Sequence, residues 1–200
     1  MTDERILKAY EQERRRILEL EESIVCDRHN PVFGEGSARA RIMLIGEAPG
    51  KFEAMEGRPF VGKAGKQLDE LLESVGVERK ELFITNAVKY RPMKPDSQKG
   101  ANRTPTLAEI KAALSVLAVE IECVRPFVVV TLGNTPLTAV SLLWGEKVPK
   151  IGDAHGRCIE CGTHKLFPLY HPASAIYNMA LLDVMKDDII KLNYVIKELL

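Results

Sequence analysis

The stretch RIMLIGEAPG, at residues 41–50, combines a short apolar run with a turn of small residues. A continuous apolar run of this length, ended by glycine and proline, is typical of a buried strand followed by a tight turn. A mixed loop then leads to Phe60, which follows a proline. Small residues let another group come close to the backbone, and the aromatic ring offers that group a flat apolar face.

Further apolar runs alternate with helical patterns along the rest of the chain. Strands are expected at residues 40–46, 81–88 and 126–133, and a hairpin over 156–172 leads into a last strand that ends at His171. Helices are expected at about 4–25 and at 65–76, 107–124, 134–144 and 180–200. Short buried strands that alternate with helices predict an α/β fold with a parallel sheet covered on both faces.

The composition is that of an ordinary globular protein, with 46% hydrophobic and 28% charged residues. A chain of 200 residues suits a single domain, here residues 1–200 with an N-terminal helix at about 4–25. No apolar run is long enough to cross a bilayer, and the charged N-terminus is unlike a signal peptide, so a cytoplasmic protein is expected. In that compartment disulfides are not expected among the four cysteines, Cys26, Cys123, Cys158 and Cys161.

The expected strands end in residues that can bind a ligand. The first ends in GEAPG at 46–50, the second places Asn86 near its end, the third ends in TLGNTP at 131–136, and the fourth ends at His171. In a parallel sheet the carboxyl ends of the strands lie along one edge, where ligands bind. We therefore expect the small-residue turn, Asn86, Phe60 and His171 to line one pocket.

This set of groups suits a flat ligand with hydrogen-bonding edges. The ring of Phe60 offers a stacking face, and the amide of Asn86 offers a donor beside an acceptor. Backbone N–H groups of the turn and the ring of His171 can donate to oxygens. A nucleobase such as uracil requires these contacts. Each residue alone has an ordinary structural explanation, and the turn is neither GxGxxG nor Walker A, so phosphate binding has weak support.

Four motifs then make a family recognisable: GEAPG at 46–50, GRPFVGKAG at 57–65, ITNAVKYRP at 84–92 and YHPA at 170–173. In this order and at these separations they resemble the uracil-DNA glycosylase superfamily, and most closely its iron–sulfur type, family 4. The likeness covers about residues 32–178. It implies a three-layer α/β/α fold with a central four-stranded parallel sheet. It also implies base excision DNA repair, by hydrolysis of the N-glycosidic bond of deoxyuridine, or of other deaminated bases, to leave an abasic site.

The resemblance assigns roles to the pocket residues. Phe60 matches the ring that stacks on the flipped uracil, Asn86 matches the residue that reads its polar edge, and His171 matches the histidine that donates to uracil O2. The backbone of the first motif, with Gly46, Ala48 and Gly50, is expected to contact the base and to place a water.

Two carboxylates complete the implied site. Glu53 falls where many relatives carry an acid near the C5 edge of the base, which helps to exclude thymine. Glu47 follows the first glycine of the motif, as in family 4. Other branches carry Asp or Asn where this chain has Ala48, so activation of the water falls either to the backbone or to Glu47.

The substrate implied by the resemblance is uracil-containing DNA, single- or double-stranded, bound by a monomer. The segment between Arg79 and Arg103 carries seven basic and two acidic residues, a net charge of +5. It is either a solvated loop or a surface that meets phosphates. A wedge should fill the space left by a flipped base, and Ile176 or Tyr177 is the candidate unless both only pack the following helix. The candidate phosphate contacts are Lys89, Arg91, Lys94 and Arg103.

The cysteines depart from the family 4 pattern, which holds a 4Fe–4S cluster on four thiolates. Cys26 is retained, but the other ligand positions carry His29, Tyr90 and Ala113. We therefore expect no cluster and no other cofactor. A second set, His155, Cys158, Cys161 and His164, has ligand types that suit zinc. Because these residues surround an expected hairpin, we interpret them as ordinary residues of that hairpin, and no metal is expected.

Two other function classes remain open at this stage. The loss of the cluster motivates a non-catalytic nucleic-acid-binding relative, against which the presence of Phe60, Asn86 and His171 argues. A nucleotide- or sugar-phosphate-binding enzyme of Rossmann type is more distant, because the chain lacks a phosphate loop.

Overall fold

The computed structural model describes residues 3–95 and 100–198, except for the side chain of Tyr177. Its centre is a sheet in the order β2-β4-β3-β6-β8-β7. The strands are β2 (Glu35–Gly36), β4 (Phe83–Asn86), β3 (Ile42–Gly46), β6 (Val128–Leu132), β8 (His164–Leu169) and β7 (Ile159–Cys161). The four central strands are parallel, and β2 and β7 join the edges antiparallel. The predicted four-stranded parallel core is confirmed, with two short edge strands added.

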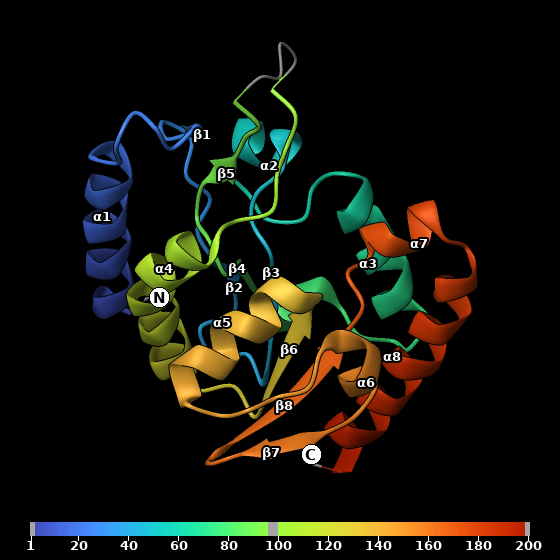
Figure 1. Ribbon diagram of the computed structural model, residues 1–200. Coiled ribbons are helices and arrows are strands. Elements are labelled where there is room, and N and C mark those ends of the chain that lie inside the picture. The colour runs from blue at the N-terminus through green and yellow to red at the C-terminus, as the bar shows by residue number, and fades with distance from the viewer. Residues whose placement is uncertain (1–2, 96–99, 199–200) are drawn as a thin grey trace.

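Helices cover both faces of this sheet (Figure 1). One face packs against α1 (Glu4–Leu18), α4 (Leu107–Val124) and α5 (Asn134–Trp144). The other packs against α3 (Lys63–Glu73) and α8 (Ala180–Glu198). Strand β3 shows why both faces are apolar: Met43 and Ile45 join the first core, and Ile42 and Leu44 join the second. A strand buried on both faces reads as a continuous apolar run, and this is why residues 42–45 are all hydrophobic.

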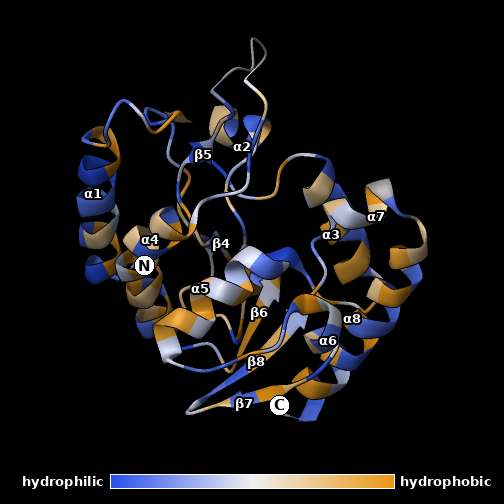
Figure 2. Ribbon diagram, in the orientation of Figure 1, coloured by the Kyte–Doolittle hydropathy of each residue, from blue (hydrophilic) through white to orange (hydrophobic). Residues whose placement is uncertain are grey.

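The helices themselves are amphipathic, and Figure 2 shows hydrophobic and hydrophilic bands alternating along α1 and α8. The shorter elements are α2 (Lys51–Glu56), α6 (Ile151–Ala154), α7 (Ala173–Tyr177), the 3₁₀ turn Arg79–Glu81, and the paired strands β1 (Cys26–Asp27) and β5 (Arg91–Pro92). Strands β7 and β8 form the predicted hairpin, with Cys161 opposite His164. Within the described ranges, no helix has the length and apolar character that crossing a membrane requires.

The N-terminal helix is shorter than expected: α1 ends at Leu18 and not near residue 25. The guanidinium of Arg28 donates to the carbonyl oxygens of Leu20 and Ile24, at 2.9 and 3.3 Å. These bonds hold residues 20–25 in turns that lead into β1, which pairs with β5. The apolar spacing therefore continues beyond Leu18, although the helix ends there and Arg28 binds carbonyl oxygens of the residues that follow.

Candidate active site

A cavity of about 460 Å³ opens at the carboxyl edge of the parallel strands. The chain continues from β3 to β4 on one side of the sheet and from β6 to β8 on the other, so the strand order reverses between β3 and β6. Such a switch point is where ligands bind in open α/β sheets. The turn after β3, the end of β4 and the loop after β8 all reach this cavity, as the sequence predicts. Its lining includes the expected residues Glu47, Ala48, Gly50, Glu53, Phe60, Asn86 and His171.

Gly46 lies behind this lining and holds two of its members close together. It is the register partner of Asn86 on the neighbouring strand. A Cβ at Gly46 would lie 2.4 Å from Asn86 Oδ1 and 2.5 Å from Phe60 Cζ. No side chain fits there, so the glycine is what lets the amide and the aromatic ring share one wall of the cavity.

Phe60 adopts a strained backbone conformation to reach this wall. Its φ is 54°, in the left-handed region that non-glycine residues rarely adopt, and its side chain is buried. Arg79 holds it there by donating to the Phe60 carbonyl oxygen at 3.0 Å and to the Pro59 carbonyl oxygen. Gly65 packs directly against the Phe60 carbonyl, where a Cβ would lie only 1.9 Å from the oxygen. Sequence reasoning counted Arg79 only as part of a basic stretch and missed this role.

Asn86 is the last residue of β4 and is 3% exposed. The backbone just after it is tied to the first motif, because the N–H of Ala87 donates to the Gly46 carbonyl at 2.9 Å and that of Val88 to the Glu47 carbonyl at 3.1 Å. The two motifs that the sequence places 40 positions apart therefore form one rigid unit at the edge of the sheet.

The hydrogen bond that the ring of His171 accepts decides which of its nitrogens carries the proton. The backbone N–H of Ala173 donates to His171 Nδ1 at 3.2 Å. An N–H can only donate, so Nδ1 is the acceptor and the proton of the neutral ring lies on Nε2. Burial lowers the pKa of His171 to about 4, against a smaller opposing effect of the Glu53 charge. At neutral pH the site therefore holds an uncharged ring with an Nε2–H donor.

The two glutamates of the site differ in what holds them. The hydroxyl of Thr135, in the first turn of α5, donates to Glu47 Oε2 at 2.6 Å. Glu53 accepts from the backbone N–H groups of Gly50 and Gly62, at 3.1 and 2.8 Å, and from that of Val61 at 3.2 Å. Glu53 therefore ties the two ends of the loop together, and its contact with the C5 edge of a base stays a prediction.

The four residues that were expected to contact phosphates differ in burial and in their partners. Lys89 is 0% exposed and its ammonium pairs with Glu120, so the expectation that it meets DNA is corrected by its burial. Arg91 is largely buried, with Nε donating to Asn102 Oδ1 at 2.6 Å. Arg103 pairs with Glu109 at 2.7 Å. Lys94 is exposed, and Lys99, which contributed to the counted charge, lies outside the described residues.

Two lysines at the mouth of the cavity were missed by sequence reasoning. Lys51 and Lys63 are exposed, line the cavity, and are the first residues of α2 and α3. Each directly follows a glycine of one of the four family motifs, and this position is the sequence feature that could have identified it.

Of the two wedge candidates, Ile176 is 43% exposed on α7, and the side chain of Tyr177 lies outside the described residues. Met179, just beyond α7, is 69% exposed and was also missed.

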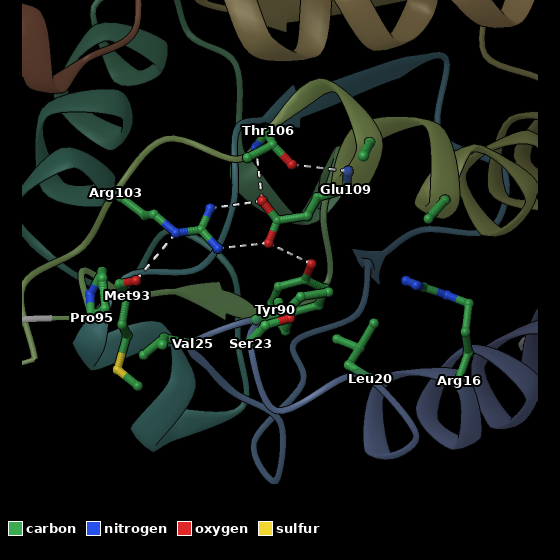
Figure 3. Close-up of a pocket in the computed structure, with 13 residues that line it drawn as sticks. Arg16, Leu20, Ser23, Val25, Tyr90, Met93, Pro95, Arg103, Thr106 and Glu109 are labelled. Carbon is green, nitrogen blue, oxygen red and sulfur yellow. Dashed lines mark hydrogen bonds and ion pairs between the residues drawn. The ribbon is translucent and has the colours of Figure 1, made fainter.

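The residues at the cluster positions do not fit an iron–sulfur cluster. Cys26 supplies the one thiol of the four positions, His29 is exposed, and Ala113 has no ligand atom. The hydroxyl of Tyr90 donates to Glu109 Oε1 at 2.7 Å, and Arg103 donates to both oxygens of the same carboxylate (Figure 3). Beside this network lies a cavity of about 520 Å³, lined mainly by apolar atoms of α1, α4 and the loops between them.

The second set of possible metal ligands is also engaged elsewhere. His155 Nδ1 lies 2.6 Å from Asp188 Oδ2, and the ring of His164 stacks on Trp144 with centroids 5.0 Å apart. Cys161 is buried and Cys158 is exposed. Over the described parts of the chain, His, Cys, Asp and Glu form no group of three or more that could hold a metal ion.

A pocket that gathers an aromatic ring, an amide and a neutral histidine at the carboxyl edge of a parallel sheet defines an α/β protein whose site suits a flat ligand with hydrogen-bonding edges. The chain belongs to the uracil-DNA glycosylase superfamily, whose family model, "Uracil DNA glycosylase superfamily", matches residues 33–192. It is 41% identical over 166 residues to the type-4 uracil-DNA glycosylase of Saccharolobus solfataricus, covering 80% of this chain and 74% of that protein.

Two more relatives narrow the branch. The type-4 uracil-DNA glycosylase of Thermotoga maritima is 39% identical over 175 residues, which is 86% of each chain. The type-5 uracil-DNA glycosylase of Pyrobaculum aerophilum is 32% identical over 169 residues, 77% of this chain and 70% of that protein. The higher identities with type-4 proteins place this chain in the type-4 branch.

Proposed function

We propose that this protein is a uracil-DNA glycosylase, which hydrolyses the N-glycosidic bond of deoxyuridine in DNA and leaves an abasic site for base excision repair. The observation that carries the proposal is the meeting of Phe60, Asn86 and the Nε2–H of His171 in one cavity. The type-4 uracil-DNA glycosylases that resemble this chain over most of its length support the same activity.

Recognition of the base follows from the fixed groups of the cavity. A base in a duplex must leave the stack before its glycosidic bond can be reached. The flipped base stacks on Phe60, while Asn86 accepts from uracil N3–H and donates to O4. Cytosine reverses both of these groups, with an acceptor at N3 and an amino group at C4. The backbone around Asn86 is held against the Gly46 turn, and an amide oriented for uracil would meet cytosine with a donor facing a donor and an acceptor facing an acceptor.

The chemical step breaks the bond between C1′ of the sugar and N1 of uracil. The bonding electrons go to the base, and the sugar becomes an oxocarbenium-like species. The Nε2–H of His171 donates to O2, where negative charge develops, and a donor placed in this way contributes a few kcal/mol to the transition state. Because the ring is neutral, it stabilises the uracil anion by a hydrogen bond and need not transfer its proton.

A water molecule completes the reaction by adding its oxygen to C1′, and its proton passes to a base. We assign that base to Glu47, because its carboxylate lines the cavity and Thr135 fixes one of its oxygens at 2.6 Å. Ala48, the small neighbour, leaves room beside the backbone for the water.

The DNA backbone is expected to run over the mouth of the cavity. Lys51 and Lys63 are exposed cations that line this mouth and can meet phosphates there, and Lys94 is a further exposed cation that can contact the DNA backbone. Ile176 is the proposed wedge, because it is an exposed apolar side chain five residues beyond His171. These assignments replace the buried Lys89 and the internally paired Arg91 and Arg103.

The direct test incubates the protein with single- and double-stranded oligonucleotides that contain one uracil, thymine, hypoxanthine or xanthine. Alkaline cleavage at the resulting abasic site then reports excision on a gel. We expect cleavage at uracil and none at thymine. Tight binding of the uracil oligonucleotide without abasic-site formation would instead establish a non-catalytic nucleic-acid-binding protein.

We also propose that this type-4 relative folds without an iron–sulfur cluster. Tyr90 stands at a ligand position where a thiolate would be required, and there it hydrogen-bonds to Glu109, which pairs with Arg103. Arg103 also donates to the Met93 carbonyl at 3.2 Å, so the network fastens the segment after β5 to the start of α4 (Figure 3).

Metal analysis and a visible spectrum of the protein purified under anaerobic conditions test this assignment. We expect iron well below one atom per chain and no iron–sulfur absorption band, together with full excision activity. Stoichiometric iron with that absorption band would contradict the assignment, whatever the activity.

A further inference from the structure

A fully buried ion pair lies directly beneath the base-reading residue. The ammonium of Lys89 and the carboxylate of Glu120 are 2.7 Å apart, and both side chains are 0% exposed. Lys89 follows β4, and Glu120 belongs to α4, which packs on this face of the sheet. Buried charges are costly to remove from water, so a pair kept in this position calls for an explanation.

The hydrogen bonds of Lys89 connect the pair to Asn86. The ammonium donates to Glu120 Oε2, to Thr85 Oγ1 and to the backbone carbonyl of Asn86, each at 2.7 Å. These three bonds use all the protons of the ammonium. One of them therefore clamps the peptide group of the residue whose side chain forms a wall of the base cavity.

The carboxylate of Glu120 anchors the clamp to the rest of the fold. Its Oε1 accepts from the hydroxyl of Tyr10 on α1 at 2.8 Å and from the N–H of Gly34 at 3.3 Å. Burial, reinforced by the negative charge of Glu120, raises the pKa of Tyr10, so its hydroxyl stays protonated and donates. The Asn86 carbonyl is thus tied through Lys89 to elements that do not touch the cavity.

We propose that Lys89 is a positioning residue for uracil recognition: by holding the Asn86 carbonyl from below, it fixes the direction of the Asn86 amide in the cavity. The inference rests on the proposed function, because it concerns how the same cavity reads its base. The ion pair with Glu120 keeps the ammonium aimed at that carbonyl. If the pair served stability alone, a neutral and equally stable replacement would leave uracil recognition intact.

The double variant K89M/E120Q provides that replacement. Methionine keeps the unbranched apolar stem of Lys89, and glutamine retains an acceptor for Tyr10 and a donor for Thr85. No charge is left unpaired, so the variant is expected to melt close to the wild type. The variant loses the ammonium's donors to the Asn86 carbonyl and to Thr85, and the glutamine amide can replace only the one to Thr85. The matched control is K111M, the same exchange at an exposed lysine of α4.

Two measurements, made at temperatures below the melting transition, test the positioning role of Lys89. They are kcat for uracil excision and product inhibition by free uracil. The proposal expects K89M/E120Q to bind free uracil roughly tenfold more weakly and to lose a comparable factor in kcat, as for one lost charge-assisted hydrogen bond. K111M should match the wild type in both. A folded K89M/E120Q with unchanged inhibition and kcat would overturn the positioning role while leaving the proposed function intact.

Failure of the wild type to excise uracil would instead remove the proposed function and this inference with it. Should the double variant not fold, K89M alone at low temperature is the second test. Wild-type uracil inhibition in that variant would overturn the proposal, and weakened inhibition would support it.

Discussion

At the scale of single residues, we expect the largest effect on catalysis from His171, whose neutral ring lines the cavity and carries its proton on Nε2. Replacing His171 with alanine removes that donor and the Nδ1 acceptor of the Ala173 N–H, and leaves the bond from the Ser174 N–H to the residue 171 carbonyl in place. We expect H171A to lower the single-turnover rate of uracil excision roughly 100- to 1,000-fold, the usual effect of losing an oxyanion donor. Its melting temperature should stay near that of the wild type, and an unchanged excision rate would show that another group stabilises the leaving base.

The pKa of His171 gives a second prediction at this scale. The folded value of about 4 lies below the ordinary 6.5, so the unfolded chain binds the proton more readily. The neutral ring therefore contributes stability that is fully present above pH 6.5 and is lost as the pH falls toward 4. Excision should not titrate with an ordinary histidine pKa near 6.5 and should decline only toward pH 4. A pH–rate profile of the free enzyme measures this, and a decline centred near pH 6.5 would contradict it.

At the scale of elements, the starts of α2 and α3 form the expected DNA surface. Lys51 and Lys63 lie there beside the cavity, whereas Lys80 lies before β4, at the opposite edge of the sheet. Each phosphate contact contributes about one unit to the salt dependence of binding. We expect K51A and K63A each to lower the slope of log Kd against log salt by about 1, with weaker binding to every sequence. K80A is the control, and an equal loss in K80A would show only a general charge effect.

Glu109 holds the junction between β5 and α4 together, and its protonation makes the stability of this junction depend on pH. Burial tends to raise the pKa of Glu109, but hydrogen bonds from Arg103, Thr106 and Tyr90 outweigh it and lower the pKa to about 2. The carboxylate therefore contributes stability that is present above the ordinary value of 4.5 and is lost as the pH falls toward 2.

Removing the Tyr90 hydroxyl tests this junction directly. Y90F deletes one hydrogen bond to the charged Glu109 and keeps the buried ring, so we expect a loss of about 1–2 kcal/mol in the free energy of unfolding. Urea titration at neutral pH measures it. The difference between Y90F and the wild type should shrink on acidification as Glu109 becomes protonated, and a difference that does not depend on pH would assign the loss to packing.

At the scale of the whole molecule, the alternation of apolar strands with helices was enough to predict the layers and the parallel core. Strand β3 is the clearest case, because burial on both faces requires an unbroken apolar run and the sequence shows one. The two edge strands were not predicted as such. Strand β2 is only two residues long, and β7 appeared in the sequence only as one arm of a hairpin. Elements this short carry too few residues for a periodicity.

The sequence by itself determined the architecture of this protein and which motifs meet at the cavity. The motifs that contain Gly46, Phe60, Asn86 and His171 sit where strands end, and parallel strands end at a common edge. Chain order and local pattern therefore sufficed for these residues.

Only the tertiary structure decided what the charged and polar side chains do. Lys89 looked like a phosphate contact until Glu120, 31 residues further along the chain, was seen to lie against it in the core. Tyr90, Arg103 and Glu109 likewise become one network only when β5 and α4 meet, and Arg79 serves Phe60 across 19 residues. The reason is physical: a charge in a sequence states its sign but not its partner, and whether it faces water, DNA or a buried counter-charge depends on contacts that form only when distant segments pack together.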